Sequence, residues 1–111
     1  AACALRAARD GWSVCVNYNA SAAPAASVVA AIRDGGGQAV AVQGDIAREA
    51  DVVALFDQAE AALGPVTGLV NNAGIIGTKS RFQDISLARF QGLLATNTTG
   101  AFLAAREAVR R

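Results

Sequence analysis

Apolar residues follow two different periods along the chain, and together they predict alternating strands and helices. Short runs rich in β-branched and aromatic residues predict strands at 12–18, 38–43 and 67–71. Between the second and third runs, apolar residues recur at steps of three and four, which is the period of an amphipathic helix. The members of this stripe are Val52, Leu55, Phe56, Ala59 and Leu63.

Three further helices are predicted from composition and from helix-end signals. Ala-rich stretches at 2–9 and 24–34 predict two of them, and each stretch is followed by a glycine-containing turn. Ser86 has the residue type and position of an N-cap for a last helix that continues towards Arg111. This regular alternation of helices and strands predicts an α/β fold with a parallel sheet, in one domain.

Composition and charge narrow the class of protein. Hydrophobic residues make up 53% of the 111 residues and charged residues 17%, which is enough apolar material for the core of one domain. The net charge is +1 and the chain has no His, so a nucleic-acid partner is not expected. Because no apolar run approaches the roughly 18 residues of a membrane span, a membrane partner is not expected either.

The two cysteines indicate the compartment. Cys3 and Cys15 stand apart in apolar surroundings, which favours simple packing in a reducing cytosol over a disulfide. We therefore expect a cytoplasmic protein. Two separated cysteines without any His do not make a metal-binding set, so no metal site is expected.

The most informative stretch for chemistry is Asn-Asn-Ala-Gly at 71–74, which begins where the predicted strand 67–71 ends. In an open parallel sheet, ligands bind outside the carboxyl ends of the strands. Asn71 and Asn72 would offer amide donors and acceptors there, and Ala73 and Gly74 are too small to keep a flat ligand away. The alternative is an Asx turn that simply ends the strand.

Two more candidates follow the other predicted strands. Asp45 can accept a hydrogen bond from an amino group and Ile46 can lie on a ring face, although Asp45 could instead cap the next helix. Tyr18 and Asn19 end the first strand, where dinucleotide-binding folds select their cofactor. Residues 17–19 include neither an acid for a ribose hydroxyl nor a base for a 2′-phosphate.

A carboxamide interrupts the apolar face of the last predicted helix. The residues that share this face with Asn97 are Phe90, Leu94, Ala101 and Ala104. A buried amide without partners costs about 1–3 kcal/mol, and the residues at 98–100 are poor helix formers. The helix therefore either ends and restarts here or is locally distorted, and Asn97 is either a structural cap or a functional residue.

The stretches at 71–74 and 97–100 (Asn-x-x-Gly) lie at a spacing that resembles the short-chain dehydrogenase/reductase family. The type resembled is the single-domain one, which includes ketoacyl reductases and glucose dehydrogenases. The resemblance implies a Rossmann-type, doubly wound parallel sheet. It also implies an NAD(P)-dependent oxidoreductase that transfers a hydride between the nicotinamide and a carbonyl or alcohol.

The same resemblance implies roles for the residues already singled out. Asn97 would belong to the catalytic tetrad and support the proton relay. The expected cofactor-binding residues are Tyr18 and Asn19 by the ribose, Asp45 and Ile46 on the adenine, and Asn72, Ala73 and Gly74 along the cofactor. Because no acid ends the first strand, NADP is favoured over NAD as the cofactor.

Several parts of the family pattern are absent from residues 1–111. The glycine-rich loop would precede Ala1, and the catalytic Ser and the Tyr-x-x-x-Lys pair would follow Arg111. We therefore expect an internal fragment, a partial Rossmann domain with the second to fourth strands, in which strand 67–71 lacks its neighbour. Such a piece should be poorly stable and inactive by itself.

The resemblance implies further partners. The substrate would be a small carbonyl or alcohol whose identity the sequence does not give, and the protein would form tetramers through the helix at 86–111. The alternative is a non-catalytic nucleotide-binding or scaffold domain with the same fold, because a fold does not specify a function. A Tyr-x-x-x-Lys pair beyond Arg111 would separate the two.

Overall fold

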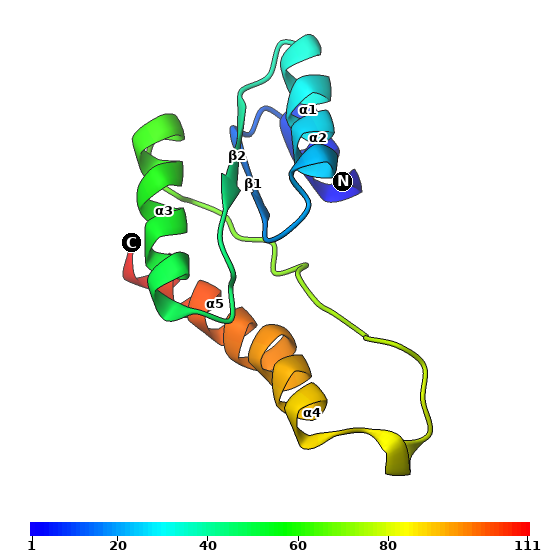
Figure 1. Ribbon diagram of the computed structural model, residues 1–111. Coiled ribbons are helices and arrows are strands. Elements are labelled where there is room, and N and C mark those ends of the chain that lie inside the picture. Colours follow the sequence, from blue (N-terminus) through cyan, green and yellow to red (C-terminus); the bar gives the residue numbers. More distant parts are fainter.

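The computed structural model describes residues 1–111, in which helices and strands alternate as far as residue 63 and only helical elements follow (Figure 1). The elements are α1 (Ala2–Arg9), β1 (Val14–Tyr18), α2 (Ala22–Asp34), β2 (Ala39–Gln43), α3 (Glu49–Leu63), η1 (Phe82–Asp84), α4 (Leu87–Leu94), η2 (Ala95–Gly100) and α5 (Ala101–Arg110). The predicted helices and the first two predicted strands are confirmed, with boundaries that differ by at most two residues.

β1 and β2 form a parallel pair in which Val14 lies opposite Ala39 and Tyr18 opposite Gln43. A parallel pair needs a crossover connection, and α2 supplies it. Helices cover both faces of the sheet: α1 and α2 lie on one face, and α3 lies on the other (Figure 1). This layered arrangement confirms the predicted doubly wound α/β fold class.

The sheet separates two apolar cores. The core on the α2 face contains Val29, Ile32 and Ala39, with Val14 and Val16 of β1 packed against it. The core on the α3 face consists of Ile46, Val52, Phe56 and Leu103. Burial of each large apolar side chain contributes about 1.5–3 kcal/mol to folding, so this second core holds α3 and α5 together.

The third predicted strand, 67–71, is wrong for this structure. The segment is not paired with β1 or β2, and Leu69 and Val70 are 41% and 66% exposed. An apolar run becomes a strand only when its backbone N–H and C=O groups pair with another strand, and no strand is hydrogen-bonded to this segment. Between it and β1 is a groove of about 430 Å³, lined in part by Trp12 and Cys15.

The last helix begins as predicted and then changes its winding. The Ser86 hydroxyl caps α4 by accepting a hydrogen bond from the Arg89 N–H at 3.1 Å. At Ala95–Gly100 the helix becomes a π-helical turn, η2, before α5 continues it. This turn confirms the predicted local distortion around Asn97, and π-helical turns are frequent at functional sites. None of the helices combines the length and apolar character needed to cross a membrane.

Candidate functional site

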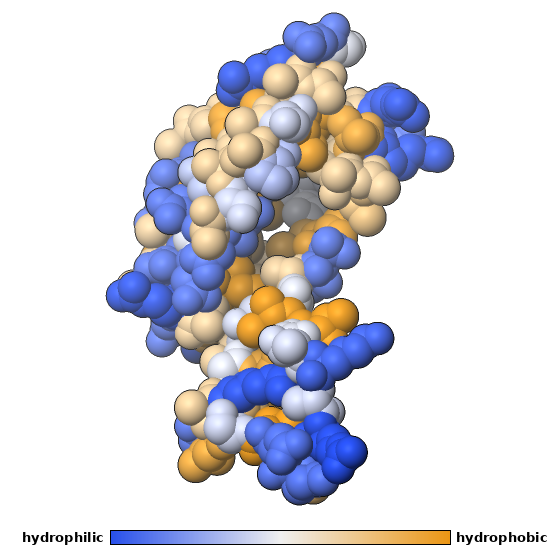
Figure 2. Space-filling view, turned by 45° about the vertical axis from the view of Figure 1, so that its right-hand side comes forward, coloured by the Kyte–Doolittle hydropathy of each residue, from blue (hydrophilic) through white to orange (hydrophobic).

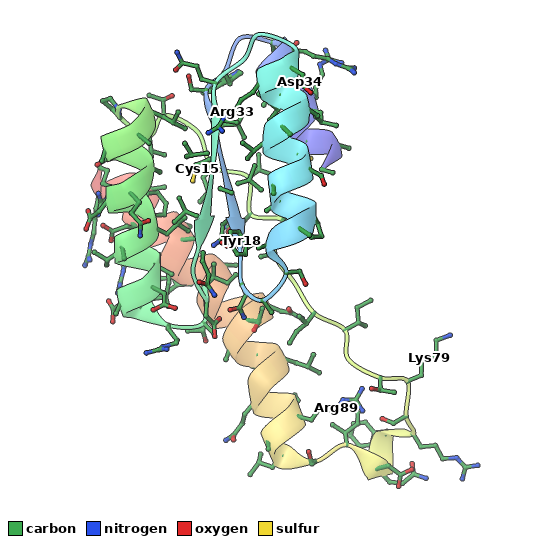
Figure 3. The ribbon with its side chains drawn as sticks, turned by 45° about the horizontal axis from the view of Figure 1, so that its top comes forward. Cys15, Tyr18, Arg33, Asp34, Lys79 and Arg89 are labelled. Carbon is green, nitrogen blue, oxygen red and sulfur yellow. The ribbon has the colours of Figure 1, made fainter.

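The carboxyl ends of β1 and β2 are tied together by side-chain and backbone hydrogen bonds. The Asn17 amide donates to the carbonyls of Val42 and Gly44 at 3.2 and 3.0 Å. The Gly44 N–H donates to the carbonyl of Tyr18 at 2.9 Å. Tyr18 and Asn19 therefore lie at the same sheet edge as the loop that begins with Gly44. Figure 3 shows Tyr18 at the end of β1 beside α2.

Asp45 does not cap α3, which was the alternative prediction for this residue. The N-cap of α3 is Arg48, and it has no side-chain cap hydrogen bond. Instead, Oδ1 of Asp45 accepts from the Ala47 N–H at 3.0 Å, and the Asp45 N–H donates to Oδ2 of Asp51 at 3.0 Å. These bonds fix the loop and leave Oδ2 of Asp45 without a hydrogen bond in the chain.

Ile46, the second residue of this loop, packs inward. Its side chain is only 9% exposed and belongs to the core with Val52, Phe56 and Leu103. It also lies directly against Gly100 of η2. That Ile46 contacts an adenine ring stays a prediction, because its side chain here is engaged with the helices.

Asn97 uses both polar atoms of its side chain on one neighbouring residue. Its Oδ1 accepts from the Ile75 N–H at 2.7 Å, and its Nδ2 donates to the Ile75 carbonyl at 2.7 Å. A Cβ on Gly74 would lie 3.4 Å from Oδ1 of Asn97, so the chain passes close to the amide there. Asn97 is thus no helix cap; it holds the backbone that follows Asn72, Ala73 and Gly74.

A second bond reinforces this arrangement. The Asn71 amide donates to the Ala101 carbonyl at 3.0 Å, at the start of α5. The bond joins the start of the Asn-Asn-Ala-Gly stretch to the helix, so the Asn71 side chain does more than end a strand. Asn72 contributes its N–H to the Val70 carbonyl at 3.1 Å, and Asn72 and Ala73 are exposed.

The structure therefore brings two of the predicted segments, the Asp45 loop and the 71–75 stretch, to one helical turn, whereas Tyr18 and Asn19 stay at the end of β1, bonded to Gly44 and Gln43. Ile46 of the Asp45 loop contacts η2 at Gly100, and the 71–75 stretch contacts η2 and α5 through Asn97 and Ala101. Sequence reasoning missed the roles of Asn17, Asn71 and Gly100. Asn17 carried a signal, because a carboxamide inside an apolar strand needs partners.

Two ionisable groups with shifted pKa values lie outside this site. Partial burial raises the pKa of the Cys15 thiol, which keeps it protonated at neutral pH. Hydrogen bonds to Asp57, Glu107 and Glu60 raise the pKa of Arg111 further above its ordinary value. These ion pairs join α3 to the end of α5 and have no part in the candidate site.

Comparisons with known proteins agree with this architecture. A family model described as short chain dehydrogenase matches residues 1–111. An oxidoreductase of Escherichia coli (strain K12), called uncharacterized oxidoreductase YgfF, is 41% identical over 110 residues, which are 99% of this chain and 44% of that protein. Glucose 1-dehydrogenase 2 of Bacillus subtilis (strain 168) is 33% identical over 108 residues, 97% of this chain and 42% of that protein.

A solved structure gives the same result in three dimensions. A short chain dehydrogenase from Burkholderia cenocepacia J2315 in complex with NADP superposes with a TM-score of 0.90 and 35% identity, covering 98% of this chain and 45% of that one. The chain thus spans less than half the length of the relatives it matches. The family match nevertheless extends over every residue, from the first helix to the last. The chain therefore belongs to the short-chain dehydrogenase family.

Proposed function

We propose that residues 1–111 are part of the dinucleotide-binding domain of an NAD(P)-dependent oxidoreductase. The whole protein would transfer a hydride between the nicotinamide and a small carbonyl or alcohol substrate. The observation that carries the proposal is the pair of 2.7 Å hydrogen bonds between Asn97 and Ile75. They hold the backbone next to the Asn-Asn-Ala-Gly stretch against η2, the turn that Ile46 of the Asp45 loop also contacts, at Gly100.

The residues present fit the dinucleotide that this family implies. Asp45 has one carboxylate oxygen, Oδ2, free of hydrogen bonds in the chain, and a carboxylate oxygen can accept from the amino group of an adenine. Tyr18, half-buried, and Asn19, exposed, lie at the same sheet edge. Ala73 and Gly74 present little side chain, which leaves room for a flat ligand along the backbone. When bound, the nicotinamide would supply the hydride.

Asn97 would support the reaction by holding other groups in place. Both polar atoms of its side chain are hydrogen-bonded to the backbone of Ile75, so it fixes the chain after Gly74. The same bonds fix the π-helical turn relative to the stretch that would line the cofactor. Precise placement of this kind is a large part of catalysis, because misplacing a group by about 1 Å can cost about 10²-fold in rate.

The choice of cofactor and the assembly are parts of the same proposal. NADP is favoured over NAD because no acidic residue ends β1 to bind a ribose 2′-hydroxyl. A homotetramer paired through the helix at 86–111 belongs to this proposal because several large apolar side chains of that helix are exposed, and such side chains mark an interaction surface where they form one contiguous patch. These side chains are Leu87, Phe90, Leu94, Phe102 and Val109.

The test uses the full-length protein that carries this chain. We expect oxidation of NADPH, more slowly of NADH, with a panel of small ketones and aldehydes. Asn97→Ala should lower kcat by about 10²-fold, because the cofactor-lining stretch loses both bonds to η2. The matched control is Thr99→Ala, since Thr99 is exposed in the same turn and its side chain makes no hydrogen bond; its kcat should stay close to that of the wild type.

Two results would contradict the proposal. If the protein bound NADPH or NADH but oxidised neither with any carbonyl, a non-catalytic binding domain would replace the enzyme. If it bound neither dinucleotide, the fold alone would remain.

A further inference from the structure

The backbone conformation of Gly100 does not require a glycine. Its φ and ψ are −61° and −44°, which any residue adopts in a right-handed helix, and Ala is a much better helix former than Gly. The requirement is one of space. A Cβ on Gly100 would lie 2.9 Å from both Cδ1 and Cγ1 of Ile46 and 3.0 Å from the Ile46 carbonyl oxygen.

Neither side of this contact can move away freely. Gly100 is buried, and the Ile46 side chain is enclosed by Val52, Phe56 and Leu103. Packed interiors have few voids into which a side chain can retreat. The carbonyl of Ile46 belongs to the backbone, so no rotamer change removes it from Gly100.

Each side of the contact belongs to a different part of the proposed site. Ile46 directly follows Asp45, whose carboxylate and N–H are fixed by bonds to Ala47 and Asp51. Gly100 ends the same π-helical turn that contains Asn97, which in turn holds the backbone of the residue after Gly74. A continuous path of contacts therefore runs from the Asp45 loop through η2 to the 71–75 stretch.

We propose that the contact between Ile46 and Gly100 couples the adenine end of the dinucleotide site to the turn that carries Asn97. Both residues are then positioning residues for hydride transfer, and the inference rests on the proposed function. Well-packed contacts change between discrete arrangements and do not stretch continuously. A dinucleotide seated on the Asp45 loop would therefore fix the position of η2, and a displaced η2 would carry Asn97 with it.

The test compares variants of the full-length protein with NADPH and, in parallel, NADH. Gly100→Ala should weaken dinucleotide binding and also lower kcat at saturating dinucleotide, each by about tenfold, because a shift of a few tenths of an ångström reaches both sides. Ile46→Ala removes the two carbons nearest to the new methyl group. The double variant Gly100→Ala/Ile46→Ala should therefore recover part of the kcat that Gly100→Ala loses.

Gly92→Ala is the matched control, because Gly92 is also helical but a Cβ there would meet nothing within 4 Å. Its dinucleotide affinity and kcat should stay close to wild type, with an unchanged or higher Tm. If Gly100→Ala does not fold, Ile46→Val tests the coupling instead, because it removes only Cδ1 of Ile46, one of the atoms that contact Gly100. It should lower kcat at saturating dinucleotide by a smaller factor.

The kcat at saturation distinguishes coupling from a local packing role. If Gly100→Ala or Ile46→Val changes only Tm, or raises KM for the dinucleotide with kcat unchanged, the coupling is refuted. The same holds if Ile46→Ala fails to restore any kcat to the folded Gly100→Ala protein. Failure of the proposed function is a separate result: the wild type would oxidise neither dinucleotide, or Asn97→Ala would keep full kcat.

Discussion

Residues 1–63 and residues 64–84 differ in how far their apolar side chains are buried. In the first region helices lie on both faces of the β1–β2 pair, and buried residues occur in α2, β2 and α3 (Figure 1). In the second region no residue is buried, and Val70, Ile76 and Phe82 are 66%, 89% and 90% exposed. Both regions contain large apolar residues. The difference therefore comes from the surfaces available to cover them.

The second region is held at separate points by single residues. The Trp12 ring lies against Gly68, where a Cβ would be 3.2 Å from it, and Asn97 holds Ile75. Arg89 of α4 binds the Thr78 carbonyl and the Ser80 hydroxyl (Figure 3). Figure 2 shows one face of the molecule, on which apolar residues are visible between polar ones around a central hollow. Segments held in this way open locally at low free-energy cost.

The largest expected effect comes from exchanging one phenylalanine in each region. In the full-length protein that carries this chain, Phe56→Ala should lower the free energy of unfolding by about 3–5 kcal/mol, because Phe56 is 4% exposed in the α3–α5 core. Phe82→Ala should cost no more than about 0.5 kcal/mol. Domains are stable by about 5–15 kcal/mol in total, so the first variant should lose most of its cooperative transition. Urea unfolding followed by circular dichroism measures both, and equal losses would contradict the comparison.

This contrast also explains how far the fold could be predicted. The stripe through Val52, Phe56 and Ala59 determined which face of α3 is buried, because helical periodicity is a local property. The segment 67–71 contains the apolar pair Leu69 and Val70, but a strand depends on a neighbour that local sequence does not specify. Whether segment 67–71 forms a strand is therefore decided by the presence of a neighbouring strand and not by its own composition.

The candidate site divides in the same way. Asp45, Asn97 and the 71–74 stretch could be identified from residue types at strand ends and in a helix face. The contact of Ile46 with Gly100 could not, since it joins residues far apart in the chain and depends on how closely two backbones approach. Nor could the sequence indicate that both polar atoms of the Asn97 side chain would form hydrogen bonds with the backbone of Ile75.

A smaller effect is expected at the point where α4 holds the second region. Arg89→Ala should speed tryptic cleavage after Lys79 by roughly twofold to tenfold, because the loop loses hydrogen bonds that contribute about 0.5–1.5 kcal/mol each. Arg89→Lys should restore only part of the protection, since an ammonium lacks the planar fork that reaches two acceptors. Arg81→Ala is the control, as Arg81 is exposed and its side chain makes no hydrogen bond. An unchanged cleavage rate after Lys79 in Arg89→Ala would mean that other contacts hold the loop.

The smallest effect concerns the groove where the two regions meet. Cys15 lines it together with Val66, on the side of the sheet that faces α3 (Figure 3), whereas Cys3 is exposed on α1. Burial raises the pKa of the Cys15 thiol above its ordinary value of 9.0. The folded chain therefore holds this proton more tightly than the unfolded chain, and its stability should fall as the pH rises above 9.0. Cys15→Ala should remove that part of the pH dependence, and Cys3→Ala should not.

Alkylation of the same thiols tests whether the groove stays closed. Only the thiolate reacts, so iodoacetamide at pH 8 should modify the Cys3→Ala variant, which retains Cys15, more slowly than the Cys15→Ala variant, which retains Cys3. The Cys15 rate should go on rising above pH 9.0, because the raised pKa of this thiol shifts thiolate formation to higher pH. Equal rates in the two variants would show that the chain at 65–68 leaves β1 uncovered. The contact between Trp12 and Gly68 would then be too weak to join the two regions.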